Sequence, residues 1–241
     1  PGVAPVELRA ELTAEPPGSD TDWRRAVPVG PVPEPGPLPK PELRRLGNAF
    51  WYRIPWAGEI WMEPDRILAY APRAPMIPGL EMELLEQTFA LRLSERGLPV
   101  IHSAAVEIDG AAFALVAASG GGKSTLTVAL VQQGAGFLAD DLVALYGPER
   151  EVRPGHLSLR VHPDTARERL GTAAVRPVHP WHKATKFVTD VPAWGRVRAE
   201  PAPLRALCRV TADPTLDVVR IQPLSGHTAV RVWIDAQIGL D

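Results

Sequence analysis

Hydrophobic residues dominate three short runs that begin near residue 48. The runs AFWYRIPW, EIWMEP and RILAYAP are rich in β-forming residues and are bounded by Gly or Pro. This pattern predicts three strands of one small sheet. No basic groove accompanies the aromatic residues, so we expect them to pack in the core or on a sheet face and not to stack on bases.

A helical period follows these runs. Hydrophobic residues recur at spacings of three and four, which is typical of one face of an amphipathic helix. They are Met82, Leu85, Phe89 and Leu93. Gly97 is expected to end this helix, because glycine readily adopts the left-handed conformation found after a last helical turn.

Two apolar runs, residues 100–108 and 111–117, flank the dipeptide Asp109-Gly110. Asp-Gly supplies the positive φ angles of a two-residue turn, so the two runs predict an antiparallel hairpin. The second run leads into AASGGGKST, residues 117–125, and a helical pattern follows it. A strand, a glycine-rich loop and a helix therefore succeed one another.

The glycine-rich loop fits the phosphate-binding template G-x-x-x-x-G-K-[ST], except that Ala117 takes the place of its first glycine. The exchange is tolerated if Ala117 has a negative φ. Lys123 is expected to reach the terminal phosphates, and Ser124 to bind Mg²⁺. The residues predicted to contact a nucleotide are Ser119, Gly120, Gly121, Gly122, Lys123, Ser124 and Thr125. The alternative, a glycine-rich turn with an exposed lysine, explains neither the preceding strand nor the following helix.

Two adjacent aspartates interrupt the apolar run FLADDLVAL, and Asp140 lies 17 positions after Lys123. Burying carboxylates without a cation or donors is costly, which favours a site over a solvated turn. One carboxylate of Asp140 and Asp141 is expected to hold the metal and the other to accept a proton from an attacking hydroxyl. His102, on the strand that pairs with the loop-bearing strand, either contacts a phosphate, orients a carboxylate or is a core histidine.

Composition narrows the choice of partners. The net charge of −2 predicts neither nucleic acid nor an anionic membrane as a partner. The single cysteine forms no internal disulfide, and no signal-peptide pattern or membrane-spanning run is apparent, so a cytoplasmic location is expected. Prolines at nearly alternate positions over residues 27–43 predict an extended connector.

Residues 98–145 resemble the catalytic core of the HPr kinase family, most of all the lasso-peptide kinases that act on ribosomally made precursor peptides. The shared pattern is a histidine on the entering strand, a hairpin, a loop ending in GKST and two adjacent aspartates. The resemblance implies an α/β fold like that of phosphoenolpyruvate carboxykinase, with a mixed sheet and a P-loop. The chain then divides into a proline-rich extended arm (residues 1–46), a small N-terminal α+β subdomain (47–98) and a P-loop kinase domain (99–241).

The resemblance also implies an activity. ATP and Mg²⁺ would serve as cofactors for phosphoryl transfer to a Ser or Thr hydroxyl of a peptide or protein, such as a lasso precursor peptide. It assigns Asp140 as the general base and places Asp141 with Ser124 at the metal. Family precedent predicts self-association.

The C-terminal half adds further candidates. Arg160 and Lys186 are predicted contacts for phosphate or peptide, and residues 175–187 are predicted to form a lid or substrate loop. The runs LRALCRV and LDVVRIQP predict strands. A terminal helix is expected after the N-cap residue Ser225. Its predicted buried stripe is Ala229, Val230, Trp233, Ile234 and Ile238.

Other activities are compatible with a glycine-rich loop. A small-metabolite kinase is one, although such enzymes separate the two aspartates by one residue. A nucleotide-binding interaction module without catalysis is another, which Ala117 favours and the intact Lys123 disfavours. A transporter-type ATPase is set aside because no LSGGQ-like signature follows the loop.

Overall fold

The computed structural model describes residues 9–29, 40–171, 175–177, 186–213 and 215–238. This part of the chain forms two compact units, one ending at Arg92 and the other running from Leu93 to Ile238. The boundary lies within α3 (Phe89–Glu95), a few residues before the domain boundary expected from the sequence.

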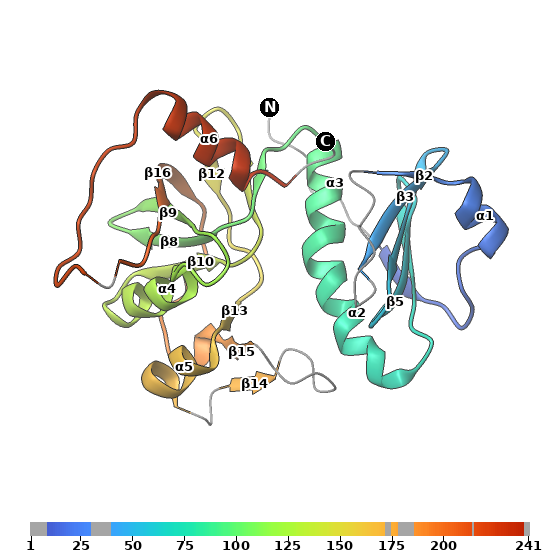
Figure 1. Ribbon diagram of the computed structural model, residues 1–241, viewed down its shortest axis with the longest axis horizontal. Helices are drawn as coiled ribbons and strands as arrows, with labels where there is room; N and C mark the ends of the chain where they lie inside the picture. Colours follow the sequence, from blue (N-terminus) through green and yellow to red (C-terminus); the bar gives the residue numbers. More distant parts are fainter. Residues whose placement is uncertain (1–8, 30–39, 172–174, 178–185, 214, 239–241) are drawn as a thin grey trace. The chain divides into compact units, whose positions relative to one another are not determined.

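The first unit is built on a six-stranded sheet in the order β1-β6-β5-β4-β3-β2 (Figure 1). The strands are β1 (Arg9–Leu12), β2 (Val27–Pro28), β3 (Glu42–Leu46), β4 (Ala49–Ile54), β5 (Gly58–Met62) and β6 (Arg66–Tyr70). The three predicted strands are found as β4, β5 and β6. The first three strands lie in the segment that the sequence assigned to an extended arm. The turn at Gly47-Asn48, which pairs Leu46 with Ala49, is the overlooked signal.

Aromatic side chains fill one side of this sheet. Trp51 is fully buried, and Trp23 and Trp61 meet it edge-on with ring centroids 5.2 Å away. Trp23 comes from α1 (Asp20–Arg25), which Ser19 caps reciprocally with Asp22. The tryptophans of this cluster are therefore packing residues, as expected.

The predicted amphipathic helix consists of α2 (Ile77–Glu83), a π-helical turn (Leu84–Thr88) and α3, preceded by a 3₁₀ turn (Ala74–Met76). The extra residue in a π turn shifts the phase of the positions that follow it. The predicted stripe is wrong in part: Leu85, within the π turn, is 42% exposed, whereas Leu80 before it and Leu91 after it are buried.

The second unit is centred on a seven-stranded sheet in the order β10-β8-β9-β16-β12-β11-β7. The strands are β7 (Val100–Ile101), β8 (Ala104–Ile108), β9 (Ala111–Val116), β10 (Gly136–Ala139), β11 (Val143–Tyr146), β12 (Glu151–Val152) and β16 (Ala202–Arg209). Only β9 and β16 run parallel among these neighbours, so the sheet is mixed, as predicted.

The predicted hairpin is confirmed for residues 104–108 and 111–115, whereas Val100 and Ile101 form β7, which pairs with β11. Its strands β8 and β9 pair from Ile108 and Ala111 at the turn to Ala104 and Leu115 at the far end. Asp109 and Gly110 have φ angles of +50° and +82°, the signs that a type I′ turn requires. The hairpin fixes where β9 delivers the chain into the glycine loop.

Helices cover both faces of the mixed sheet (Figure 1). On one face α4 (Lys123–Gln132) contributes Val128 and Val131 to a core that also contains Val106 of β8. On the other face α6 (Gly226–Ala236) contributes Val232 and Ala236. Ala105 of β8 packs in the core under α6 and Val106 in the core under α4, because successive side chains of a strand point to opposite faces of the sheet.

A smaller sheet adjoins α4. Its strands are β13 (Ser158–Val161), β15 (Phe187–Asp190) and β14 (Val175–Pro177), in that order. The connections hold α5 (Pro163–Thr165), a π-helical turn (Ala166–Leu170) and a 3₁₀ turn (Val191–Ala193). Leu159 and Val161 pack into the core beneath α4.

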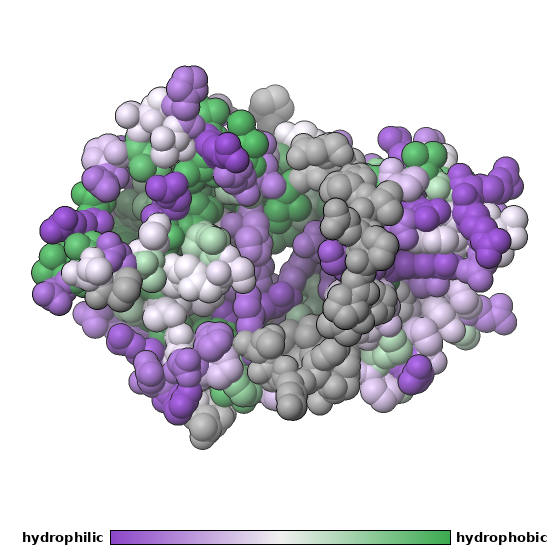
Figure 2. Space-filling view, in the orientation of Figure 1, coloured by the Kyte–Doolittle hydropathy of each residue, from purple (hydrophilic) through white to green (hydrophobic). Residues whose placement is uncertain are grey.

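Two predictions for the C-terminal region are wrong. The stripe predicted for α6 includes Val230 and Ile234, which are 57% and 59% exposed; Val232 and Ala236 are buried instead. The segment LDVVRIQP forms no strand among the described residues of this region. Its apolar residues Val218, Val219 and Ile221 are exposed, and Figure 2 shows apolar surface where this segment runs, at the left edge of the view.

Gly58 provides a test of the first unit. Its φ is +133°, and a Cβ at this position would lie 2.0 Å from the carbonyl oxygen of Tyr70. We predict that Gly58→Ala lowers the free energy of unfolding by at least about 3 kcal/mol. Gly47 also has a positive φ but has open space around it, so Gly47→Ala should cost about 1–2 kcal/mol. Urea unfolding followed by tryptophan fluorescence measures both, and equal losses would contradict the steric account.

Candidate functional site

The glycine loop, residues 117–122, depends on its three glycines for two reasons, backbone conformation and close packing. Gly120 and Gly122 have φ angles of +77° and +93°, which side chains other than that of glycine rarely allow. Gly121 donates its N–H to the carbonyl of Ala118, and a Cβ there would lie 3.1 Å from the Cβ of Ala117. Ala117 itself has no positive φ, which meets the condition for replacing the template's first glycine.

The helix α4 begins directly after this loop, at Lys123. The first N–H groups of a helix have no partner within the helix, and the helix dipole favours an anion in front of them. The loop and the helix end therefore form a setting suited to a phosphate group.

A second turn brings the two adjacent aspartates, the carboxylate pair (Asp140 and Asp141), to the same place. They follow β10, and Asp141 has a φ of +62°. This left-handed conformation is uncommon for a residue with a side chain and is frequent at functional sites. The N–H of Leu142 donates to the carbonyl of Asp140 and closes the turn.

Lys123 joins the two turns. Its Nζ lies 2.9 Å from Oδ1 of Asp140 and 3.1 Å from Oδ1 of Asp141. The side chains of the three residues are only 12%, 2% and 13% exposed. One ammonium group thus bridges two carboxylates that are nearly withdrawn from solvent.

The carboxylate pair is strained electrostatically. Burial, reinforced by repulsion from Asp141, raises the pKa of Asp140, although Lys123 and the N–H of Arg160 oppose this rise. That N–H lies 3.1 Å from Oδ2 of Asp140. Burial acts to lower the pKa of Lys123, but attraction to both carboxylates outweighs it and the pKa is raised. A proton acceptor and a fixed cation are therefore held together.

Two more side chains complete the cluster. His102 directs its ring at Asp141: Nδ1–H donates to the backbone carbonyl at 3.1 Å, and Nε2 lies 3.8 Å from Oδ1. Nε of Arg160 lies 3.5 Å from Oδ2 of Asp141. The sequence predicted His102 on the strand that pairs with β9, and this prediction is wrong: His102 lies in the bend between β7 and β8. Its backbone N–H donates to the carbonyl of Ala236.

The remaining predicted site residues have different surroundings. Ser124 lies in the first turn of α4, and Ser119 is exposed in the glycine loop. The hydroxyl of Thr125 is engaged by that of Thr165 at 2.7 Å, a contact that ties α4 to α5 and that the sequence did not indicate. Lys186 is exposed next to β15, and no described contact joins it to the cluster. Most of the predicted lid or substrate loop, residues 178–185, lies outside the described part of the chain.

The donor set fits Mg²⁺ bound through a nucleotide. Mg²⁺ keeps several waters and takes one or two carboxylates together with phosphate oxygens. Asp141 and the hydroxyl of Ser124 would be its protein ligands. In the part of the chain that the structure describes, no group of three or more His, Cys, Asp or Glu side chains could hold a metal ion. Phosphate oxygens and waters would therefore supply the other ligands.

Comparison with known proteins gives a partial likeness. The chain is 38% identical over 74 residues to a protein named HPr kinase/phosphorylase from Lactobacillus delbrueckii subsp. bulgaricus. The matched segment covers 31% of this chain and 23% of that relative. No family model matches the chain. Among the described residues, no helix is long and apolar enough to cross a membrane.

The coupling of Lys123 to the carboxylate pair can be measured without any ligand. We predict that Lys123→Met lowers the free energy of unfolding by about 3 kcal/mol or more, because it removes the cation that pairs with both buried carboxylates and leaves Asp140 without a charged partner. Arg167→Met removes a cation from an exposed ion pair with Asp164 and should cost less than about 1 kcal/mol. Urea unfolding followed by circular dichroism measures the free energy of unfolding of both variants. Similar losses in the two variants would show that Lys123 does not stabilise the buried carboxylate pair.

Proposed function

We propose that this chain is an ATP- and Mg²⁺-dependent kinase that transfers a phosphoryl group to a Ser or Thr hydroxyl of a peptide or protein. The observation that carries the proposal is the Lys123 ammonium held between two buried carboxylates at the start of a helix that follows a glycine loop. The partial likeness to an HPr kinase/phosphorylase supports phosphoryl transfer in general.

Each part of the cluster has a role in such a transfer. The amides of the glycine loop and of the first turn of α4 would bind the phosphates, and Lys123 would neutralise the terminal ones. Bound Mg²⁺ supplies charge neutralisation and alignment. His102 and Arg160 both contact Asp141 and would fix the orientation of its carboxylate at the metal.

Asp140 would act as the general base. The acceptor hydroxyl oxygen forms a bond to the γ-phosphorus, the bond from that phosphorus to the β–γ bridging oxygen breaks, and ADP leaves. The hydroxyl proton passes to the carboxylate of Asp140. Burial raises the pKa of this group, which makes its ionised form a stronger proton acceptor than an exposed aspartate.

Two polypeptide acceptors fit this activity. The resemblance to lasso-peptide kinases favours the hydroxyl of a precursor peptide. The relative's name points to the protein HPr. Both acceptors present a hydroxyl on a polypeptide, so one assay can compare them.

We predict different defects for two substitutions. Lys123→Ala should abolish transfer of phosphate from ATP. Asp140→Asn should lower turnover by about 10²–10⁴-fold, because it removes the proton acceptor. Its affinity for ATP should change by less than about threefold, equivalent to under 1 kcal/mol.

Radioactive transfer measures turnover and calorimetry measures ATP affinity for these variants. Arg167→Ala, on an exposed turn away from the cluster, is the matched control and should retain activity. If Asp140→Asn lost ATP binding and turnover equally, Asp140 would be a structural residue and not the base.

An acceptor screen separates the proposal from its competitors. The purified chain is incubated with Mg²⁺-ATP and, in turn, HPr, precursor peptides from neighbouring genes, sugars and small alcohols. A gain of phosphate mass on a polypeptide that requires Lys123 supports the proposal. Transfer to small alcohols alone would make the chain a metabolite kinase, and Lys123-dependent ATP binding without any transfer would make it a nucleotide-binding module.

A further inference from the structure

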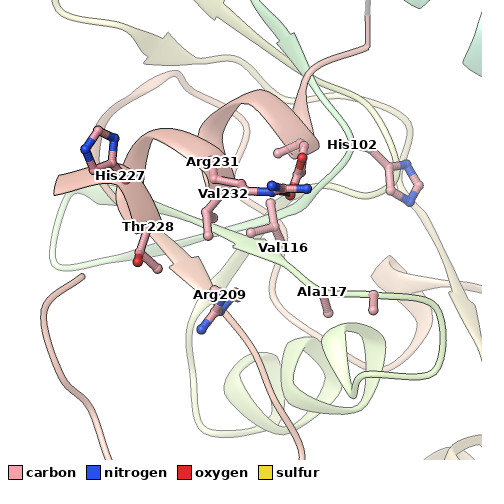
Figure 3. A pocket seen from close by; sticks show the side chains of 11 residues that line it. His102, Val116, Ala117, Arg209, His227, Thr228, Arg231 and Val232 are labelled. Carbon is pink, nitrogen blue, oxygen red and sulfur yellow. Dashed lines mark ion pairs between the residues drawn. The ribbon is translucent and has the colours of Figure 1, made fainter. Parts of the chain in front are cut away.

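A pocket of about 510 Å³ lies between α6 and the end of β9, in the second unit (Figure 3). Its floor is apolar and is formed by Val116, Ala117 and Val232. His102 lies at one end, and His227 and Thr228 lie toward the other (Figure 3). This volume falls within the range of roughly 300–1,000 Å³ that is usual for small-molecule sites.

The pocket is continuous with the proposed phosphate site. Ala117 and Ala118 line it and are also the first two residues of the glycine loop, where the carbonyl of Ala118 accepts the N–H of Gly121. His102 lines it as well and contacts Asp141. A ligand held by its phosphates on the loop would therefore have its remaining part next to this pocket.

The chemistry of the lining differs from that of a phosphate site. An apolar floor with a few polar groups at its edge is typical of sites for flat organic molecules. His227 supplies an imidazole at the end of α6 away from His102, and Arg209 supplies a guanidinium on the opposite side of Thr228 (Figure 3). Planar cationic groups of this kind stack on aromatic rings. Thr228 provides a hydroxyl for a base or a sugar, and Asp235 provides a carboxylate whose Oδ2 lies 3.6 Å from Nε of Arg231, which also lines the pocket.

We infer that this pocket, the α6 pocket, binds the nucleoside part of the nucleoside triphosphate, with the base toward Arg209 and His227 and the phosphates toward His102 and Lys123. The inference rests on the proposed function, since it takes the glycine loop as the phosphate site. Recognition of the nucleotide is then shared between the loop, which binds phosphate, and α6, which binds the base and the sugar.

The α6 pocket also gives Ala117 a role. The template has a glycine at this position, and here the methyl group of Ala117 forms part of the apolar floor. The same methyl lies 3.1 Å from where a Cβ on Gly121 would be, so the exchange depends on Gly121 lacking a side chain. The departure from the template thus adds apolar contact for a nucleoside at the mouth of the loop.

The test compares two ligands that share phosphates but differ in the nucleoside. Mg²⁺-ATP and inorganic tripolyphosphate are titrated by calorimetry into the wild-type chain and into the double variant Arg209→Ala/His227→Ala. Both residues are exposed, so the fold is not at risk. We expect the affinity for ATP to fall about tenfold, a change of 1.4 kcal/mol, while the affinity for tripolyphosphate stays within about twofold.

The matched control is Arg205→Ala, which removes an exposed arginine from β16 outside the pocket. It should leave the affinity for both ligands unchanged. Equal losses for ATP and tripolyphosphate in the double variant would show that the two cations act through charge alone, and would overturn the nucleoside assignment. An unchanged ATP affinity with a raised KM for the acceptor would overturn it too, and would make the pocket the acceptor site.

Photolabelling gives a second, independent measurement. Irradiation of the wild-type chain with 8-azido-ATP, followed by peptide mapping, should place the label on Arg209 or on residues 226–236. A label elsewhere would overturn the inference. If the label lies elsewhere but tripolyphosphate still binds and requires Lys123, the phosphate site stands and only the α6 pocket assignment fails. If tripolyphosphate binding does not require Lys123, the proposed function itself fails.

Discussion

The burial of two adjacent carboxylates is the constraint on which the second unit depends. Asp140 and Asp141 have side chains only 2% and 13% exposed, and removing two negative charges from water is costly unless a cation accompanies them. Lys123 supplies that cation, and the backbone N–H of Arg160 supplies a further donor. The glycine loop, β10 and β13 must therefore converge on one point, and this convergence creates the candidate site.

The rest of the unit serves to hold that point in place. The β8–β9 hairpin aims the chain into the glycine loop, and the core between α4 and the mixed sheet fixes where the helix begins. The hydrogen bond between Thr125 and Thr165 links α4 to the segment that follows Arg160. On the opposite face α6 packs through Val232 and Ala236 and leaves room for the α6 pocket beside the loop.

Local signals made part of this arrangement predictable. Asp109-Gly110 has the turn chemistry of a two-residue hairpin, and the order of strand, glycines, lysine and helix predicts a tight loop between β9 and α4. The meeting of Lys123 with the carboxylate pair follows from a spacing that contains one helix, one turn and the short strand β10. The chemistry of the site was thus visible because its parts are close in sequence.

What was missed depends on contacts between distant parts of the chain. Two strands of the six-stranded sheet, β1 and β2, have only four and two residues, and β2 and β3 contain or follow a proline, so their pairing could not be seen locally. The buried face of α6 is set by the sheet on which it packs, and Val230 and Ile234 are as apolar as the residues that are buried. The left-handed conformation of Asp141 and the π turn at Leu84–Thr88 are backbone features without a sequence signal of their own.

The most direct test of the central claim is the position of the metal and the terminal phosphate in a crystal grown with Mg²⁺ and a non-hydrolysable ATP analogue. We predict that the metal lies between the hydroxyl of Ser124 and the carboxylate of Asp141, and that Nζ of Lys123 contacts the terminal phosphate. A triphosphate bound away from the glycine loop, with Lys123 still paired to both aspartates, would contradict the account.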